Sequence, residues 1–170
     1  MAQSPMNALP TEYNECSSDL LSYSSALFML PSSSLKNSRE ADWLAWFDGS
    51  AKPNPGNCKV ACILHSPDGK VTQHTANIGH GDSSDAEYQA LIAALTLLTQ
   101  QVTQPETQTV LLRGDSLVVI NDVLAVEAKA SRLLSTYRQQ ALELMQSLPR
   151  LKLKWVPRHK NIETDQLLRT

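Results

Sequence analysis

The sequence lacks a hydrophobic run long enough to cross a membrane, because no apolar stretch reaches the roughly 18 residues that a spanning helix requires. The N-terminus also lacks the basic region of a secretory signal peptide, and its acidic residues argue against a transit peptide. An excess of charge of one sign is absent as well. The formal net charge is −2, which excludes no class of partner. We therefore expect a soluble, cytoplasmic protein with no membrane partner.

Cysteine is scarce, and the three cysteines present do not predict a disulfide or a zinc site. Cys58 and Cys62 are four residues apart in a predicted strand, which separates them by about 13 Å. A disulfide requires Cα atoms within about 7 Å. A zinc site would need further ligands, and none has a suitable spacing. We expect both residues to be buried, reduced thiols.

Composition and periodicity divide the chain into two parts. Residues 1–41 are rich in serine, carry two basic and four acidic side chains, and show no strong periodic element. Within them, residues 19–30 are compatible with a short apolar helix, and residues 31–38 indicate a linker. We expect a flexible extension, with a helix that docks on the domain or on a protein partner as the alternative. Residues 42–170 carry 13 basic and 13 acidic side chains and are long enough for one domain with a real core.

The second part predicts strands and helices in a definite order. Three strands come first, with the turn signal SPDG between the second and the third. The predicted elements are strands 43–48, 59–65 and 71–78, helix 84–101, strand 109–113, helices 116–124 and 131–148, strand 151–156, and helix 161–168. This order is typical of an α/β fold in which helices flank a mixed sheet.

Four acidic residues lie where strands end or helices begin, and each has an ordinary structural explanation when taken alone. Asp48 follows the apolar stretch WLAWF and precedes Gly-Ser, as an aspartate that starts a turn does. Glu87 leads the apolar stripe of its helix, but Ser84 and Glu87 also fit a capping box. Asp115 follows an apolar strand and fits a helix N-cap. Asp165, in NIETDQLL, is by itself a surface acid.

Taken together, the four acids predict a metal site. Sites in mixed α/β sheets form at the carboxyl ends of the strands, so Asp48 and Asp115 converge if their strands are parallel neighbours. Glu87 and Asp165 then reach the same place from helices. Carboxylates that share a site repel one another, and some of them would be protonated without a cation. Ligation by oxygen alone suits magnesium or manganese.

The same acids lie in motifs that resemble those of the type 1 ribonuclease H family. FDGSAKPNPG is similar to the family's first-strand motif and AEYQALIAAL to its helix with the glutamate. GDSLVVI is similar to the motif of its second aspartate, and WVPRHKNIETDQL to its C-terminal signature. The match runs from Trp43 to Leu168. It most resembles the compact branch common in prokaryotes, because only AVEAKAS joins the two middle helices where some bacterial members carry a basic protrusion.

The resemblance implies a ribonuclease H-like fold with a five-stranded mixed sheet, in which strands one to three are antiparallel and strands four and five run parallel to strand one. It implies an endonuclease that cleaves the RNA strand of an RNA–DNA hybrid with two Mg²⁺ ions, or alternatively Mn²⁺. By resemblance, Asp48 bridges both ions, Glu87 and Asp115 bind one ion, and Asp165 binds the other. His159 is implied as a mobile proton shuttle or product-release group, and a solvated loop histidine is the alternative.

Residues expected to contact the hybrid surround these acids. Ser83 and Ser84 replace the asparagine pair that the family often has beside its glutamate, and a hydroxyl can still bond a 2′-OH. Asn54 is expected at the minor groove, and Gly56 is expected to let the backbone approach the nucleic acid. Asn161 is expected to fix its loop or orient a ligand. The predicted contact set is Gly49, Ser50, Asn54, Gly56, Ser83, Ser84, Ser116, Arg158 and Asn161.

Two alternatives from other functional classes stay open. One is a nucleic-acid-binding module without catalysis, which the four intact acids disfavour and the short last helix favours. The other is a protein-interaction module that works through residues 1–41.

Residues 150–160 carry five basic and no acidic side chains, which fits phosphate contact. The alternating lysines of LKLKWV fit the protection of an edge strand equally well.

Overall fold

The computed structural model describes residues 40–126, 131–132 and 134–170. The described elements follow the predicted order of strands and helices, with a short 3-10 helix added before the last α-helix. They are β1 (Trp43–Lys52), β2 (Gly56–His65), β3 (Val71–Gly81), α1 (Ser83–Gln101), β4 (Val110–Gly114), α2 (Leu117–Leu124), α3 (Ser135–Gln146), β5 (Leu151–Trp155), η2 (Arg158–Lys160) and α4 (Ile162–Arg169). The predicted extension, residues 1–41, lies outside the described residues up to residue 39, so its role stays a prediction.

The five strands form one mixed sheet in the order β3-β2-β1-β4-β5. β2 pairs antiparallel with β1 and β3, whereas β4 pairs parallel with β1 and β5. This arrangement confirms the predicted fold class. Because β1 and β4 are parallel neighbours, their carboxyl ends meet at the same edge of the sheet, where such folds form their sites.

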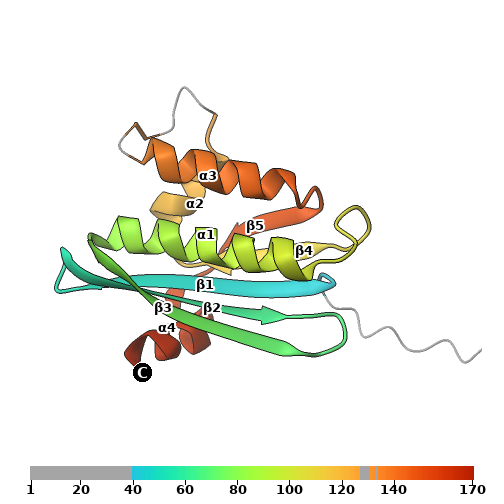
Figure 1. Ribbon diagram of the computed structural model, residues 1–170, viewed down its shortest axis with the longest axis horizontal. Helices are drawn as coiled ribbons and strands as arrows, with labels where there is room; N and C mark the ends of the chain where they lie inside the picture. Colours follow the sequence, from blue (N-terminus) through green and yellow to red (C-terminus); the bar gives the residue numbers. More distant parts are fainter. Residues whose placement is uncertain (1–39, 127–130, 133) are drawn as a thin grey trace, which may run out of the picture. The chain divides into compact units, whose positions relative to one another are not determined.

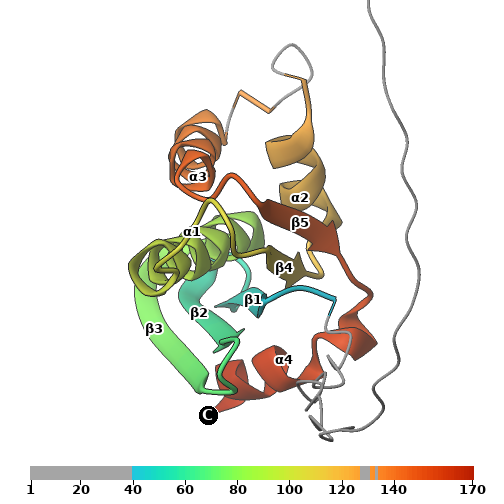
Figure 2. The same cartoon turned by 90° about the vertical axis from the view of Figure 1, so that its right-hand side faces the viewer.

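Helices cover both faces of the sheet. α1 packs on β1 and β2, α3 packs on α1, and α4 packs on β1 and β2. Two views at right angles place α1, α2 and α3 on one face of the sheet and α4 on the opposite face (Figure 1 and Figure 2). Trp43, Ala45 and Phe47 alternate along β1 and are buried in the core together with Leu91 and Leu95 of α1. The strand that carries Asp48 is therefore fixed by packing.

β1 is longer than predicted, since it continues through Asp48 to Lys52. Its pairing with β4 ends at Trp46, opposite Arg113, but its pairing with β2 continues to Lys52, opposite Asn57. The residues after Asp48 favour a turn locally, but β2 supplies backbone hydrogen-bond partners that keep them extended. Asp48 thus lies two residues beyond the last β1–β4 pair, which leaves room beside it for side chains that follow β4.

The start of α1 corrects the predicted capping box. The N-cap is Asp82, whose Oδ1 accepts hydrogen bonds from the backbone N–H of Ser84 at 2.7 Å and of Asp85 at 2.9 Å. Asp85 Oδ2 in turn accepts from the backbone N–H of Asp82 at 3.0 Å. The box of Ser84 and Glu87 is therefore wrong, because the same pattern occurs two residues earlier with carboxylates as the acceptors. Glu87 has no capping role.

Two other predictions concern burial and helix length. Cys58 and Cys62 are buried free thiols, as predicted, and burial raises the pKa of Cys62 to about 12. α3 is shorter than the predicted helix 131–148. In the part of the chain that the structure describes, no helix has the length and apolar character to cross a membrane.

Candidate active site

Three carboxylates from separate elements meet at the carboxyl edge of the parallel strands. Asp48 comes from β1, Glu87 from the second turn of α1, and Asp115 follows β4 directly. One oxygen of each side chain lies within 4.8 Å of the others. Asp48 is buried and the other two are half-buried. The structure thus brings together three of the four acids that the sequence singles out.

Gly49 explains how α1 can approach β1 closely enough for this. A Cβ at this position would lie 2.3 Å from the backbone carbon and oxygen of Ala86 and 2.5 Å from the backbone nitrogen of Glu87. Only glycine lets the two backbones pack at this distance. The Gly49 backbone also favours the ionised forms of the Asp48 and Glu87 carboxylates, although burial outweighs this effect on their pKa values. Gly49 is predicted to contact the substrate, and the structure gives it a second role, because it lets Asp48 and Glu87 lie close together.

The electrostatics of this cluster are unfavourable for the protein alone. Burial, and then the nearby carboxylates of Asp115 and Asp165, raise the pKa of Asp48 to about 7. Burial and the carboxylates of Asp48 and Asp115 raise the pKa of Glu87 to about 9. Asp48 Oδ2 and Glu87 Oε2 are buried and have no hydrogen-bond partner in the described structure. Both side chains therefore retain protons in a pH range where free carboxyl groups are ionised.

A divalent cation fits this donor set. The three acids supply only oxygen ligands, which hard cations prefer. The two oxygens without a hydrogen-bond partner carry lone pairs that could coordinate a cation. A cation would also neutralise the mutual repulsion of the acids. The cluster is accordingly a candidate metal centre made of Asp48, Glu87 and Asp115.

Asp165, the fourth predicted ligand, lies beside this cluster but is held by arginine. Its Oδ1 accepts a hydrogen bond from Arg158 Nη2 at 2.8 Å, and its Oδ2 accepts from Arg169 Nε at 3.0 Å and Nη2 at 2.6 Å. The bond from Arg158 and, to a smaller extent, the bond from Arg169 lower the pKa of Asp165. Asp165 is still near enough to contribute to the raised pKa of Asp48.

Asn161 is the residue that ties the last segment to the centre. It is 1% exposed, and its Nδ2 donates to the backbone oxygen of Phe47 at 3.0 Å and to Asp115 Oδ1 at 3.1 Å. Thr164 Oγ1 donates to Asn161 Oδ1 at 3.1 Å. These bonds fit the prediction that Asn161 fixes its loop. One amide thereby links β1, the residue after β4, and α4.

Sequence reasoning missed two side chains that act on these acids. Trp155 Nε1 donates to the backbone oxygen of Asp115 at 3.0 Å, although Trp155 itself is 42% exposed. Arg169 forms an ion pair with Asp165 from one helical turn further along α4. The signal for Arg169 is its spacing, four residues after Asp165, at which opposite charges pair on a helix.

The turn between β1 and β2 is joined to the start of α1. Asn54 Nδ2 donates to Ser83 Oγ at 3.2 Å, and the Ser83 backbone N–H donates to Asn54 Oδ1 at 3.1 Å. Both residues are exposed, so their polar groups are accessible at the start of α1. Gly56 is buried, and a Cβ there would lie 2.3 Å from the Pro53 backbone oxygen. The turn itself therefore requires glycine at position 56.

Among the described hydrogen bonds and ion pairs, none joins the remaining predicted residues to the cluster. Ser50 is half-buried on β1, Ser84 is half-buried in the first turn of α1, and Ser116 is the N-cap residue of α2. His159 is exposed in η2 and lines a cavity of about 290 Å³ together with Trp46 and His65. Its role as a proton shuttle stays a prediction.

Known proteins with similar sequences identify the family of this chain. Residues 46–169 match the family described as reverse transcriptase-like. Ribonuclease HI of Halobacterium salinarum is 32% identical to this chain over 124 residues, which are 72% of this chain and 60% of that protein. The chain belongs to the type 1 ribonuclease H family. It spans 60% of the length of this curated relative.

Solved structures of type 1 ribonucleases H share the fold of this chain. Ribonuclease H1 of Halobacterium salinarum aligns with a TM-score of 0.66 at 32% identity, over 75% of this chain and 94% of that chain. LC11 ribonuclease H1 was isolated from compost by a metagenomic approach and has been solved in complex with an RNA/DNA hybrid. That complex aligns with a TM-score of 0.66 at 26% identity, over 75% of this chain and 94% of that chain.

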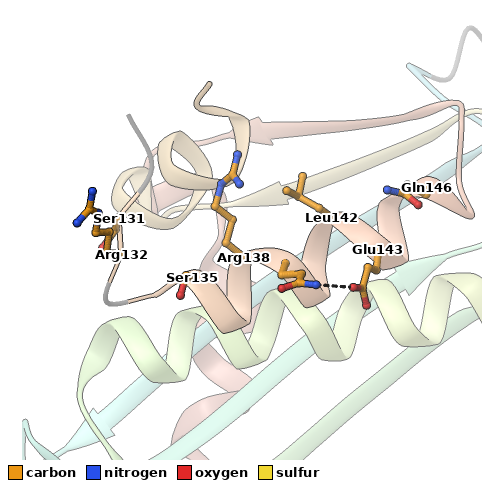
Figure 3. A pocket seen from close by; sticks show the side chains of 8 residues that line it. Ser131, Arg132, Ser135, Arg138, Leu142, Glu143 and Gln146 are labelled. Atoms are coloured by element: carbon orange, nitrogen blue, oxygen red, sulfur yellow. Dashed lines mark hydrogen bonds between the residues drawn. The ribbon is translucent and has the colours of Figure 1, made fainter. Parts of the chain in front are cut away.

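A separate cavity of this ribonuclease H domain runs along α3 and holds none of the predicted site residues (Figure 3). Its volume is about 640 Å³. Arg138 donates from Nε to the backbone oxygen of Asp122 at 3.0 Å and from Nη2 to that of Ala125 at 2.9 Å. The lining residues are Ser131, Arg132, Ser135, Arg138, Gln139, Leu142, Glu143 and Gln146. Arg138 thus secures the end of α2, which is a structural task.

Proposed function

We propose that the protein is a metal-dependent endonuclease that hydrolyses the RNA strand of RNA–DNA hybrids. The observation that carries this proposal is the cluster of Asp48, Glu87 and Asp115. Asp48 Oδ2 and Glu87 Oε2 are buried there without a partner in the described structure, and burial together with the neighbouring carboxylates raises the pKa values of Asp48 and Glu87. Such a cluster is costly to stability, and a divalent cation offsets that cost. Family membership supports the same chemistry.

In the proposed site, Asp48, Glu87 and Asp115 would hold a first divalent ion, and Asp48 and Asp165 would hold a second. Mg²⁺ is the proposed ion and Mn²⁺ a substitute, because both accept oxygen ligands. When bound, these ions supply Lewis-acid stabilisation of the charge that develops during phosphoryl transfer to water. The protons that Asp48 and Glu87 retain in the metal-free protein leave as the carboxylates become ligands. Asn161 and Trp155 keep Asp115 in position through their hydrogen bonds.

The proposed substrate is supported by the polar and cationic groups at the edge of the cluster. Asn54 and Ser83 offer an exposed amide and hydroxyl beside α1, which suit a 2′-OH and base edges in the minor groove. Arg158 and Lys160 are exposed on η2 and suit phosphate oxygens. A related ribonuclease H1 has been solved with an RNA/DNA hybrid, which supports a hybrid as the substrate here.

The proposal is tested by offering one labelled RNA strand in three contexts. The strand is presented as a hybrid with DNA, as an RNA duplex and as a single strand, each with Mg²⁺ and with EDTA. We expect metal-dependent cutting of the hybrid alone, and no cutting of the complementary DNA strand. If the folded protein binds the hybrid but does not cut it in Mg²⁺ or Mn²⁺, the nuclease proposal is rejected and a nucleic-acid-binding module is favoured.

A further inference from the structure

Asp165 differs from the other acids at the site because both of its oxygens already have cationic partners. Arg158 donates to Oδ1 at 2.8 Å, and Arg169 donates to Oδ2 at 2.6 Å and 3.0 Å. Asp48 and Glu87 each have an oxygen with no partner in the described structure. Two guanidinium groups carry the same charge as one divalent ion. At Asp165 the protein has thus placed its own counter-charge where the proposed second ion would bind.

The three side chains differ in how freely they can move. The Asp165 side chain is 15% exposed, whereas those of Arg158 and Arg169 are 74% and 65% exposed. An exposed guanidinium can leave its partner and be hydrated at small cost. A half-buried carboxylate beside Asp48 cannot lose its cation without a replacement. The arginines are therefore the exchangeable members, and Asp165 stays in place to receive another cation.

The two arginines reach Asp165 from different elements. Arg158 lies on η2, next to Lys160, and its electrostatic neighbours include Asp48 and Asp115 as well as Asp165. Arg169 lies on α4, at the i+4 position from Asp165. Arg158 is the one we assign to substrate phosphate, so a bound hybrid can draw it away. Arg169 has no such alternative partner among the described contacts.

We propose that Arg169 is a positioning residue that competes with a divalent cation for Asp165 and so sets the affinity of the site for its second ion. The inference rests on the proposed function of the carboxylate cluster. It predicts two unequal metal-binding steps. The first is at Asp48, Glu87 and Asp115, none of which forms an ion pair among the described residues, and the second occurs only when Asp165 exchanges arginine for metal. Removal of Arg169 brings the second affinity closer to the first.

The test is a calorimetric titration of Mn²⁺ into the metal-free full chain without nucleic acid. We expect Arg169→Gln to bind the second ion about three- to tenfold more tightly than the wild type, because one competing charge is gone. Arg169→Lys restores the charge without the forked hydrogen bonds, so its affinity should fall between the two. Lys70→Gln removes one positive charge from the exposed turn between β2 and β3 and should leave the second affinity unchanged.

A purely structural role for the Arg169 pair predicts a different pattern. In that case Arg169→Gln lowers the melting temperature but leaves the affinity for the second ion where it was. That result, a weaker second ion in Arg169→Gln, or a single bound ion in every variant including Arg169→Gln, would overturn the proposal. Failure of the proposed function itself is distinguishable, because the first ion would then be missing in the wild type as well.

The same variants give a second readout in the Mg²⁺ dependence of cleavage. The Mg²⁺ concentration for half-maximal rate should fall about three- to tenfold in Arg169→Gln, in step with the calorimetric affinity. In Arg158→Gln the metal dependence should shift in the same direction, while KM for the hybrid rises because a phosphate contact is lost. A change in KM without any change in metal dependence for Arg169→Gln would place it in substrate binding and contradict the proposal.

Discussion

The acids at this site form two contrasting regions. In the cluster of Asp48, Glu87 and Asp115, burial and repulsion raise the pKa values of the first two to about 7 and about 9. At Asp165, hydrogen bonds from arginine lower the pKa. The difference lies in what surrounds each carboxylate, since one region is packed against backbone and the other faces exposed guanidinium groups. The protein thus satisfies Asp165 by itself, whereas Asp48 Oδ2 and Glu87 Oε2 in the cluster have no hydrogen-bond partner among the described residues.

The two regions also differ in how they are fixed. The cluster is held by a paired strand, by the contact of Gly49 with α1, and by the bonds of Asn161 and Trp155 to Asp115. Asp165 and its arginines belong to the short η2 and α4 segment at the opposite face of the sheet from α1. A rigid, unsatisfied cluster suits permanent metal ligands. A satisfied acid with exposed partners suits a weaker metal ligand, which accepts an ion only when an arginine is displaced.

The largest expected effect comes from breaking the cluster itself. Asp48→Asn should lower the rate of hybrid cleavage by about a thousandfold or more, because the amide cannot replace the charge that holds the ions. The rate of RNA-strand cleavage under single turnover measures this. Asp68→Asn, which changes an exposed acid in the β2–β3 turn, is the matched control and should retain the wild-type rate. Equal losses in both variants would contradict the assignment.

The raised pKa values predict an unusual dependence of stability on pH in the metal-free protein. The folded state keeps protons on Asp48 and Glu87 that the unfolded state releases, so the free energy of unfolding should fall as pH rises from about 5 to about 9. The decrease should end only when the pH exceeds the folded pKa values, about 7 for Asp48 and about 9 for Glu87. Asp165 contributes with the opposite sign, since its lowered pKa gives stability that is lost only in acid.

Urea unfolding in EDTA at a series of pH values measures this decrease. Glu87→Gln should flatten the upper part of the curve, and saturating Mg²⁺ should flatten it in the wild type. A wild-type curve in EDTA that is flat between pH 5 and pH 9 would show that the cluster is relaxed without metal, and the contrast with Asp165 would disappear.

A smaller effect is expected when the cluster is pushed apart. Gly49→Ala places a Cβ 2.3 Å from the Ala86 backbone, so α1 must move away from β1. We expect a loss of about 1–3 kcal/mol in the free energy of unfolding, together with weaker metal binding. Gly114→Ala is a useful comparison, because its Cβ would meet the Phe47 ring and not the backbone that carries Glu87. It should reduce stability with less effect on metal affinity.

The smallest expected effect is on stability and concerns the residue that caps α1. Asp82→Ala should cost about 1 kcal/mol of stability, because Asp82 caps two backbone N–H groups, and Ser84→Ala should cost close to nothing. Thermal and chemical unfolding of the two variants measure the difference. The opposite ranking would restore the capping box of Ser84 and Glu87 and give Glu87 an ordinary structural explanation.

The sequence predicts much of the fold because strand order and motif spacing are local or nearly local signals. It identifies Asp48, Glu87 and Asp115 as partners, since parallel neighbouring strands must bring their carboxyl ends together. It cannot predict the length of β1, which depends on pairing with β2 across a turn. Nor does it decide between two overlapping capping patterns, because that choice depends on which residue starts the helix.

The least predictable features are the contacts made at a distance in sequence. Asn161 bonds a backbone oxygen 114 positions earlier, and no local pattern signals such a contact. The ion pair of Arg169 with Asp165 has the i,i+4 spacing of a helix. That spacing alone does not predict whether the carboxylate pairs with the arginine or remains free for a metal ion. That choice is made by the packing of α4 on the sheet.

The central claim is that the cluster of Asp48, Glu87 and Asp115 binds a divalent cation that the chemistry requires. The most direct measurement is calorimetric titration of Mg²⁺ into wild type and Asp48→Asn at pH 7.5, repeated in two buffers of different ionisation enthalpy. We predict a bound ion and released protons in the wild type, with both lost in Asp48→Asn. Equal binding in the two proteins, or wild-type binding that releases no protons, would contradict the account.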